Sequence, residues 1–222
     1  MSTSRPMPRL FIVRHGPTEW SKNGRHTGRT DIPLTEDGEA NVKIIAERLV
    51  GPGLQAVDPK KIGLALVSPR IRAQRTFELM FEKCTDKPEK VTCEEVREWD
   101  YGDYEGLKTH EIRALKPIWD IWKDGCPGGE SVSEMEYRVD SVIARVREHH
   151  KKYLAGECDT RDVLIVAHGH FNRVMVARWL RFPLSLGTHF NVEPASVAVL
   201  GYNHNNLEEP ALNALNLFAT IN

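Results

Sequence analysis

Short apolar runs alternate along this chain with stretches in which apolar residues recur at helical spacing. Continuous apolar runs predict buried strands at 10–13, 62–67 and 163–167, a last strand is predicted at 196–201, and a charged, weaker run predicts one more at 91–96. Helical periodicity predicts helices over 35–49, 69–80, 109–122, 130–153 and 171–180. Alternating strands and helices form right-handed βαβ units, so we expect a three-layer α/β fold, a mostly parallel central sheet with helices on both faces.

Local signals set several of the expected boundaries. Thr35 precedes two acidic residues and is predicted to cap its helix. Ser68 is expected to cap the next helix, with Pro69 as its first residue. The polar stretch 21–33 contains glycines and is expected to be a loop.

The chain length allows one sizeable α/β domain and is short for two. The 222 residues contain no internal repeat, low-complexity stretch or linker, so we expect a single domain over 1–222. The loop and helices between Gly102 and Gly129 are expected to form a small cap, over about residues 102–129, above the functional site.

The overall charge is almost balanced, with 30 basic and 31 acidic residues. No charge run or long apolar run points to nucleic acid or membrane as a partner, so an anion would have to bind at a local cluster. The four cysteines are too sparse for a disulfide scaffold and no signal-peptide core precedes the first apolar run, so we expect a cytoplasmic protein. Association into a homo-oligomer is left open.

Polar residues follow the predicted strands at their carboxyl ends, where ligands bind in open α/β sheets. Two arginines, two histidines and a glutamate would converge there: Arg14, His15, Arg72, Glu98 and His168. Arginine offers planar, bidentate donors that suit a phosphate dianion. This set therefore favours phosphoryl transfer.

Each of these residues has an expected role. His15 is the nucleophile that attacks phosphorus, and Arg14 and Arg72 hold the phosphate oxygens. His168, if protonated, adds a third positive donor. Glu98 protonates the leaving alkoxide and then activates water for hydrolysis of the phosphohistidine. Because these groups carry the charge, we expect no metal and no cofactor.

Several motifs, in order along nearly the whole chain, resemble those of the histidine phosphatase superfamily, which has the phosphoglycerate mutase-like fold. They are Arg14-His15-Gly16 with Pro17 to Trp20, Thr27-Gly28, Leu34-Thr35, Ser68 to Ala73 with Thr76, Glu98 with Tyr101-Gly102, Gly129-Glu130, and Ala167-His168-Gly169. The resemblance implies that His15 is phosphorylated, that Arg14, Arg72 and His168 complete the phosphate pocket, and that Glu98 is the acid and base. It also implies that Thr27 and Gly28 line the site.

Further substrate contacts are expected from residues close to these motifs: Ser21, Arg25, Tyr101, Gly169 and His170. Gly169 would allow close backbone approach to a ligand. For His170, substrate contact and packing at the helix start both stay open. Glu98 has acidic rivals as the general acid in Asp100, Asp103 and Glu105.

Within the superfamily, the stretches 97–106, 121–126, 199–204 and 209–212 are similar to fungal sedoheptulose-1,7-bisphosphatases. The connection between Leu180 and Pro194 is considerably shorter here, beside the pocket. The resemblance implies a small phosphorylated metabolite as substrate, such as sedoheptulose 1,7-bisphosphate or another sugar bisphosphate. A second phosphate would bind basic residues near the mouth: Lys22, Arg25, Arg29, Arg113, Lys123 and Arg173.

Two other functions remain as alternatives. A phosphoglycerate mutase would return the phosphoryl group to a sugar acid, but the chain lacks the arginine-rich stretch of true mutases, so hydrolysis is favoured. A phospho-ligand binding module without catalysis would be expected to lack His15 or Glu98, and both are present. The pairs His149-His150 and His168-x-His170 lack companions at metal-ligand spacing, which argues against a metal enzyme.

Overall fold

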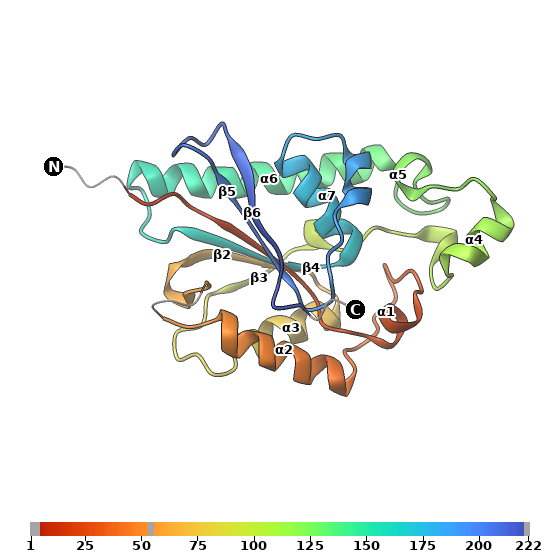
Figure 1. Ribbon diagram of the computed structural model, residues 1–222, viewed down its shortest axis with the longest axis horizontal. Coiled ribbons are helices and arrows are strands. Elements are labelled where there is room, and N and C mark those ends of the chain that lie inside the picture. Colours follow the sequence, from red (N-terminus) through yellow and green to blue (C-terminus); the bar gives the residue numbers. More distant parts are fainter. Residues whose placement is uncertain (1–4, 53–55, 220–222) are drawn as a thin grey trace.

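A six-stranded sheet forms the centre of the protein in the computed structural model, which describes residues 5–52 and 56–219. Figure 1 shows helices packed above and below this sheet. In chain order the strands are β1 (Leu10–Arg14), β2 (Ile62–Val67), β3 (Lys90–Thr92), β4 (Asp162–Ala167), β5 (Val197–Tyr202) and β6 (Pro210–Leu217). In space their order is β3-β2-β4-β1-β5-β6.

Strands β3, β2, β4 and β1 run parallel to one another, and β5 is antiparallel to both β1 and β6. In the register of β1 with β4, Arg14 lies opposite Ala167, so the residues that follow the two strands meet at one edge. β5 begins at that same edge because it runs the other way, and the Arg14 amide donates to the Ser196 carbonyl at 3.1 Å. The carboxyl ends of β1 and β4 and the start of β5 therefore lie together around the segment that follows β1.

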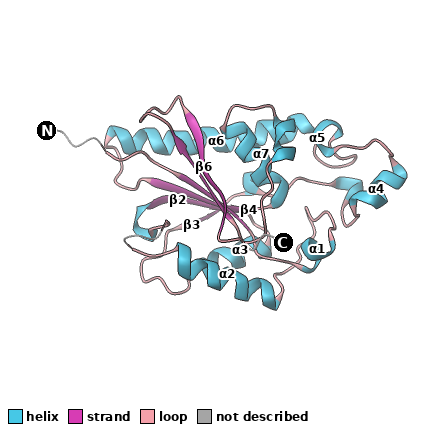
Figure 2. Cartoon of the chain, viewed as in Figure 1, coloured by secondary structure: helices cyan, strands magenta, loops and turns pink. Residues whose placement is uncertain are grey.

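Alternate residues of β1 enter different halves of the core. Phe11 and Val13 pack with helices α2 (Glu36–Leu49) and α3 (Ile71–Met80). Leu10 and Ile12 pack with helices α6 (Val132–Ala155) and α7 (Gly169–Trp179) on the opposite face. Figure 2 shows the strands fanned between these two helical layers. The predicted three-layer α/β fold is confirmed.

Helix α3 begins later than the sequence predicts. Its first residue is Ile71, and Arg70 is the cap residue without a side-chain capping bond. The Ile71 amide instead donates to Asp31 Oδ1 at 2.8 Å. Ser68 is buried, and its hydroxyl lies 2.7 Å from His168 Nε2. A distant carboxylate therefore caps this helix, which local capping rules could not anticipate.

Two predicted elements are shorter than expected. The strand predicted at 91–96 is only β3, followed by a 3₁₀ turn at Glu94–Val96. The helix predicted over 109–122 is divided into α4 (Thr109–Leu115) and α5 (Ile121–Asp124). Lys116 adopts an extended backbone with φ −135° and ψ 90°, because the following Pro117 disfavours helical geometry.

Two elements were not predicted. The short helix α1 (Glu19–Asn23) lies in the stretch expected to be a loop, where Thr18 and Ser21 form a capping box. β6 follows β5 after the connection 203–209 and forms an edge of the sheet. Its sequence places Asn213 and Asn216 among apolar residues without strict alternation, and Asn216 has a φ of 57°. A regular period-two signal is therefore missing.

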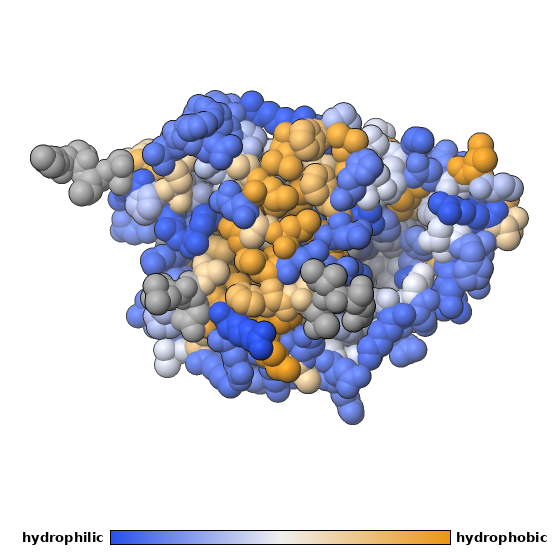
Figure 3. Space-filling model, in the orientation of Figure 1, coloured by the Kyte–Doolittle hydropathy of each residue, from blue (hydrophilic) through white to orange (hydrophobic). Residues whose placement is uncertain are grey.

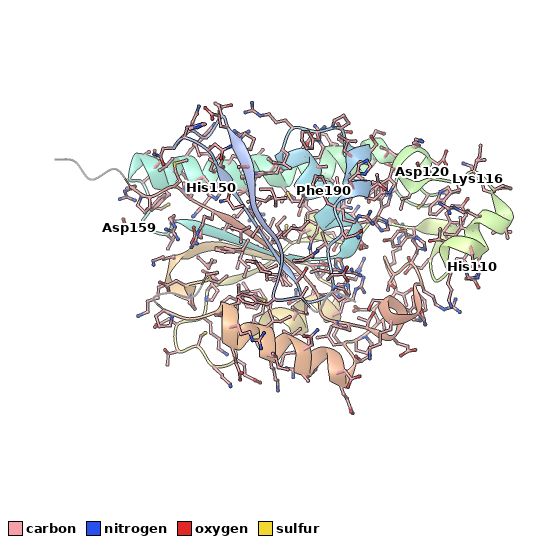
Figure 4. All side chains as sticks on the ribbon, viewed as in Figure 1. His110, Lys116, Asp120, His150, Asp159 and Phe190 are labelled. Carbon is pink, nitrogen blue, oxygen red and sulfur yellow. The ribbon has the colours of Figure 1, made fainter. Side chains whose placement is uncertain are left out.

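The segment 102–129 contains the 3₁₀ turn Gly102–Tyr104, helix α4 and helix α5. Figure 4 places His110, Lys116 and Asp120 of this segment at one end of the molecule, away from the sheet. Further 3₁₀ turns lie at Pro59–Lys61 and Leu184–His189. Among the described residues, no helix has both the length and the apolar character that a membrane crossing would need.

Candidate active site

A cavity of about 370 Å³ opens at the carboxyl end of β1. Figure 3 shows a hollow between the body of the protein and the part formed by α1 and α4, rimmed largely by hydrophilic residues. The cavity is lined by Arg14, His15, Thr18, Ser21, Gly24, Arg25, His26, Thr27, Glu98, Tyr101, Thr109, Gly169, His170, Arg173, Asn191, Val192 and Glu193. Nine of the twelve residues predicted for the site are in this set, while Gly28, Arg72 and His168 are not.

His15 is held firmly at the end of β1. Its backbone amide donates to the Ala167 carbonyl at 3.0 Å, and its own carbonyl accepts from the Ala195 amide at 3.1 Å. The ring Nδ1 lies 2.7 Å from the Gly16 carbonyl oxygen, which can only accept a hydrogen bond. Nδ1 therefore carries the proton, and Nε2 keeps its lone pair.

Burial lowers the pKa of His15 well below its ordinary value, and the charges of Arg72 and Arg14 lower it further. A low pKa keeps the imidazole neutral, the form in which Nε2 can act as a nucleophile. Arg14 lies beside it, where Nη1 donates to the Val192 carbonyl at 2.6 Å. Its buried Nε has no hydrogen-bond partner among the described residues, so this guanidinium retains a donor for an anion.

Glu98 is buried, and backbone amides hold its carboxylate at the start of α7. Oε1 accepts hydrogen bonds from the amides of Trp99 and Phe171, both at 2.9 Å. Oε2 accepts from the His170 amide at 3.0 Å and belongs to the carboxylate that lines the cavity. Of the acidic rivals that the sequence left open, Asp100, Asp103 and Glu105 do not line this cavity.

Arg72 and His168 lie behind the cavity wall, beside His15. The rings of His15 and His168 are 5.1 Å apart, centroid to centroid. Arg72 Nε donates to His168 Nδ1 at 3.2 Å, so the His168 proton is on Nε2 and points to Ser68. Burial and the Arg72 charge lower the pKa of His168 well below its usual range. A neutral His168 does not meet the condition for a third positive donor.

The rest of the Arg72 guanidinium binds backbone carbonyls of the segment that follows α1. It donates to Thr27 at 2.9 Å and to Thr30 at 3.0 Å. Gly28 is packed so closely that a Cβ would lie 2.6 Å from the Trp99 carbonyl, and its amide donates to Glu105. Gly28 and Arg72 therefore support, from behind, the part of the cavity wall that Thr27 forms.

Gly169 supports Arg14 directly. A Cβ at Gly169 would lie 3.4 Å from Arg14 Cζ, so the guanidinium lies against bare backbone. Ser21 also lines the cavity, but its hydroxyl is engaged with the Thr18 carbonyl at 2.9 Å.

An aromatic wall closes the far side of the cavity. The Tyr101 hydroxyl lies 2.7 Å from His170 Nδ1, and His26 stacks on His170 at 6.1 Å between ring centroids. Arg173 lies over the Trp122 ring at 4.9 Å. Burial lowers the pKa of both His26 and His170, so both rings favour the neutral form. His170 therefore both lines the cavity and packs in the wall.

Sequence reasoning missed His26, Thr18, Gly24, Thr109 and the segment Asn191–Glu193 as lining residues, and named Arg173 only as a basic residue near the mouth. Arg173 lies one helical turn after His170 on α7, a spacing that could have paired them. Residues 191–193 reach the cavity because β5 is antiparallel to β1. The pattern of apolar residues in β5 carries no sign of strand direction.

Most of the basic residues expected near the mouth do not line the cavity itself. Of the six, Arg25 and Arg173 line the cavity. Four are paired with acidic side chains: Lys22 with Asp37, Arg25 with Glu111, Arg29 with Asp100 and Lys123 with Asp120. Within residues 5–52 and 56–219, no three His, Cys, Asp or Glu side chains are grouped as metal ligands.

Comparison with known proteins adds the relationship. The family model of the histidine phosphatase superfamily (branch 1) matches residues 10–215. An acid phosphatase of Mycobacterium tuberculosis is 40% identical over 88% of this chain and 87% of its own length. The sedoheptulose 1,7-bisphosphatase of Saccharomyces cerevisiae is 34% identical over 92% of this chain and 91% of its own.

Solved structures agree with this relationship. The product of a Mycobacterium tuberculosis open reading frame superposes with a TM-score of 0.80 and 35% identity, covering 94% of this chain and 97% of that one. A mycobacterial glucosyl-3-phosphoglycerate phosphatase superposes with a TM-score of 0.76 and 25% identity, covering 97% of this chain and all of that one, 100%.

Proposed function

Because this chain belongs to the histidine phosphatase superfamily, we propose that it hydrolyses phosphate monoesters through a phosphohistidine at His15. One observation carries the proposal. The Gly16 carbonyl holds the proton on His15 Nδ1, so that Nε2 is a free nucleophile in a cavity that Arg14 and Glu98 also line.

In the first step, Nε2 of His15 attacks phosphorus and the bond between phosphorus and the ester oxygen breaks. A protonated Glu98 gives its proton to the departing alkoxide, which leaves as an alcohol. In the second step, the Glu98 carboxylate takes a proton from water as its oxygen attacks phosphorus. The bond from phosphorus to Nε2 breaks, and inorganic phosphate and neutral His15 are released.

Arg14 stabilises the negative charge on the transferring group, since its unpartnered Nε belongs to a guanidinium already fixed by Val192. Arg72 and His168 act from behind the cavity wall: both help to fix it, and the Arg72 guanidinium adds positive charge close to His15. We expect this set to suffice without a metal or cofactor.

We further propose a phosphorylated sugar as substrate, with a sugar bisphosphate as the first choice. The relatives that act on sedoheptulose 1,7-bisphosphate and on glucosyl-3-phosphoglycerate support a sugar phosphate. Arg25 and Arg173 line the same cavity as Arg14 and can receive a second phosphate. The neutral rings of His26 and His170 lie among them and can accept or donate hydrogen bonds to sugar hydroxyls.

The direct test is phosphate release in the presence of EDTA. The wild type, His15→Ala and Arg173→Gln are each assayed with four kinds of substrate: sedoheptulose 1,7-bisphosphate, fructose bisphosphates, 3-phosphoglycerate and an aryl phosphate. We expect a preference for one bisphosphate that Arg173→Gln weakens by about 10-fold or more, while the aryl phosphate is hardly affected. Loss of all turnover in EDTA would overturn the metal-free mechanism.

A phosphoglycerate mutase is the second candidate. The 2,3-bisphosphoglycerate-dependent mutase of a Methylobacterium species is 34% identical over 75% of this chain and 78% of its own length. Isomerisation of 3-phosphoglycerate without phosphate release in the same assay would favour it over hydrolysis.

We propose that the segment 102–129 acts as the cap expected from the sequence. Its Thr109 lines the cavity, and the Arg25 backbone pairs with that of Lys108 in an isolated bridge.

All four cysteines are free thiols: Cys84, Cys93, Cys126 and Cys158. Free thiols support the expected cytoplasmic location, because disulfides persist in oxidising compartments.

We propose that two copies of the chain associate through strand β6. This edge strand has no charged residue from Pro210 to Ala219, whereas edges are usually protected by charges. Figure 3 shows apolar residues gathered over β5 and β6, and Phe218 is 43% exposed. Light scattering should give a dimer for wild type and a monomer for Asn213→Lys, whose side chain is exposed. A monomeric wild type would refute the association.

A further inference from the structure

Glu98 lies in a segment that is neither helix nor strand. The 3₁₀ turn that precedes it ends at Val96, and Arg97 has an extended backbone. The amides of α7 fix the end of the Glu98 side chain, but they do not fix its main chain. A general acid must be held within a fraction of an ångström of its target, so another group has to anchor this backbone.

Arg138 of α6 supplies that anchor. Its Nη1 donates to the carbonyl of Glu95 at 2.8 Å and to that of Arg97 at 2.9 Å. Its Nη2 reaches the Glu98 carbonyl at 3.5 Å. The guanidinium also lies over the ring of Phe171, 5.6 Å from its centroid, and the Phe171 amide binds the Glu98 carboxylate. Arg138 therefore contacts both the main chain around Glu98 and a residue whose amide binds the Glu98 carboxylate.

Glu130 holds Arg138 in this orientation. Its two carboxylate oxygens accept from Arg138 Nε and Nη2, each at 2.7 Å, in a buried bidentate pair. Through its backbone, Glu130 also fixes the chain that follows Glu98: its carbonyl accepts from Trp99 Nε1, and its amide donates to Asp100. The pair thus binds the main chain on both sides of Glu98.

We propose that Arg138 is a positioning residue for Glu98, which sets where the acid of the proposed reaction lies. The inference rests on the proposed function, in which Glu98 protonates the leaving group. Arg138 does not line the active-site cavity and touches no reacting atom. A buried ion pair adds little net stability compared with apolar residues of equal volume. The role of the Arg138–Glu130 pair therefore lies in its contacts with the Glu98 segment.

The effect differs from a general loss of stability because it depends on the leaving group. An alkyl ester needs the proton from Glu98, whereas nitrophenolate leaves without one. The value of kcat/KM reports the steps up to the first irreversible one, here transfer of the phosphoryl group to His15. Measuring kcat/KM for a series from alkyl to p-nitrophenyl phosphates therefore isolates the acid's contribution.

The variant Arg138→Lys keeps the charge and loses the fork that reaches three carbonyls. We expect kcat/KM to fall by about 10- to 100-fold for alkyl phosphates and by less than about 3-fold for p-nitrophenyl phosphate. Glu130→Gln, which weakens the hold on Arg138, should show the same dependence on the leaving group. Arg161→Lys is the matched control, because the partly buried Arg161 forms a bidentate pair with the buried Asp162 at the opposite end of β4.

Glu98→Gln measured in the same series separates two kinds of failure. If Glu98→Gln discriminates between esters while Arg138→Lys and Glu130→Gln lower all of them equally, the role of Arg138 is wrong and the acid assignment stands. If Glu98→Gln itself does not discriminate, the proposed function loses its acid. The same discrimination in Arg161→Lys would also overturn the inference.

Discussion

His150 is a buried, uncharged histidine whose protonation should destabilise the protein. It lies on α6 with no exposed surface, and its Nδ1 is 2.7 Å from the Tyr202 hydroxyl. Figure 4 shows it on α6, and its hydrogen bond to Tyr202 joins this helix to β5. Burial lowers its pKa to about 3, and the neighbouring His149 contributes in the same direction.

The magnitude follows from linkage between protonation and folding. In the unfolded chain His150 binds a proton below about pH 6.5, whereas in the folded protein it stays neutral down to about pH 3. Its contribution to stability is therefore fully present above pH 6.5 and is lost as the pH falls toward 3. The slope is about 1.4 kcal/mol per pH unit, so lowering the pH from 7 to 5 removes about 2 kcal/mol at this site.

The assay is urea unfolding at both pH values for wild type, His150→Phe and Tyr202→Phe. His150→Phe removes the titrating ring, so its loss of unfolding free energy between the two pH values should be about 2 kcal/mol smaller than that of wild type. Tyr202→Phe removes the same hydrogen bond but keeps the imidazole, so it should retain the wild-type loss. Equal losses in wild type and His150→Phe would refute the reasoning.

Three further predictions concern the site and its supports. Because the pKa of His15 is lowered, the acid limb of kcat/KM assigned to this residue should lie below pH 6.5, and a limb above that value would contradict a neutral buried His15. Ser68→Ala leaves His168 Nε2 without its partner, so we expect the free energy of unfolding, measured by urea denaturation, to fall by about 1–3 kcal/mol. Gly102→Ala should lower the free energy of unfolding by about 2–4 kcal/mol, because φ is +51° and a Cβ would lie 2.2 Å from the Gly129 amide. Gly24→Ala, with φ +79° and open space, should lose only about 1 kcal/mol, and equal losses in the two variants would argue against the clash.

The layers of this fold could be predicted because buried strands and amphipathic helices leave clear periodicities. β1, β2 and β4 are continuous apolar runs covered on both faces, and α6 presents one apolar stripe. Where long-range contacts decide, local patterns failed: Asp31 rather than Ser68 caps α3. The edge strand β6 gave no regular alternation because its pairing with β5 is interrupted by register shifts and Asn216 has a positive φ.

The residues around the nucleophile could be predicted because parallel strands bring their carboxyl ends together. This placed Arg14 and His15 correctly beside each other and beside His168. The directions in which the side chains point could not be predicted from the sequence. Arg72 faces backbone carbonyls of the segment after α1 instead of the cavity, which depends on how that segment folds back over α3.

The central claim is that His15 becomes phosphorylated during turnover, and trapping that adduct tests it most directly. The protein is mixed with p-nitrophenyl phosphate, quenched in alkali, digested and analysed by mass spectrometry for one phosphoryl group on the peptide that contains His15. We predict an adduct on His15 that is stable to base and lost in acid, and that is absent from His15→Ala, which should not turn over. A phosphoryl group on another residue, or wild-type turnover by His15→Ala, would contradict the claim.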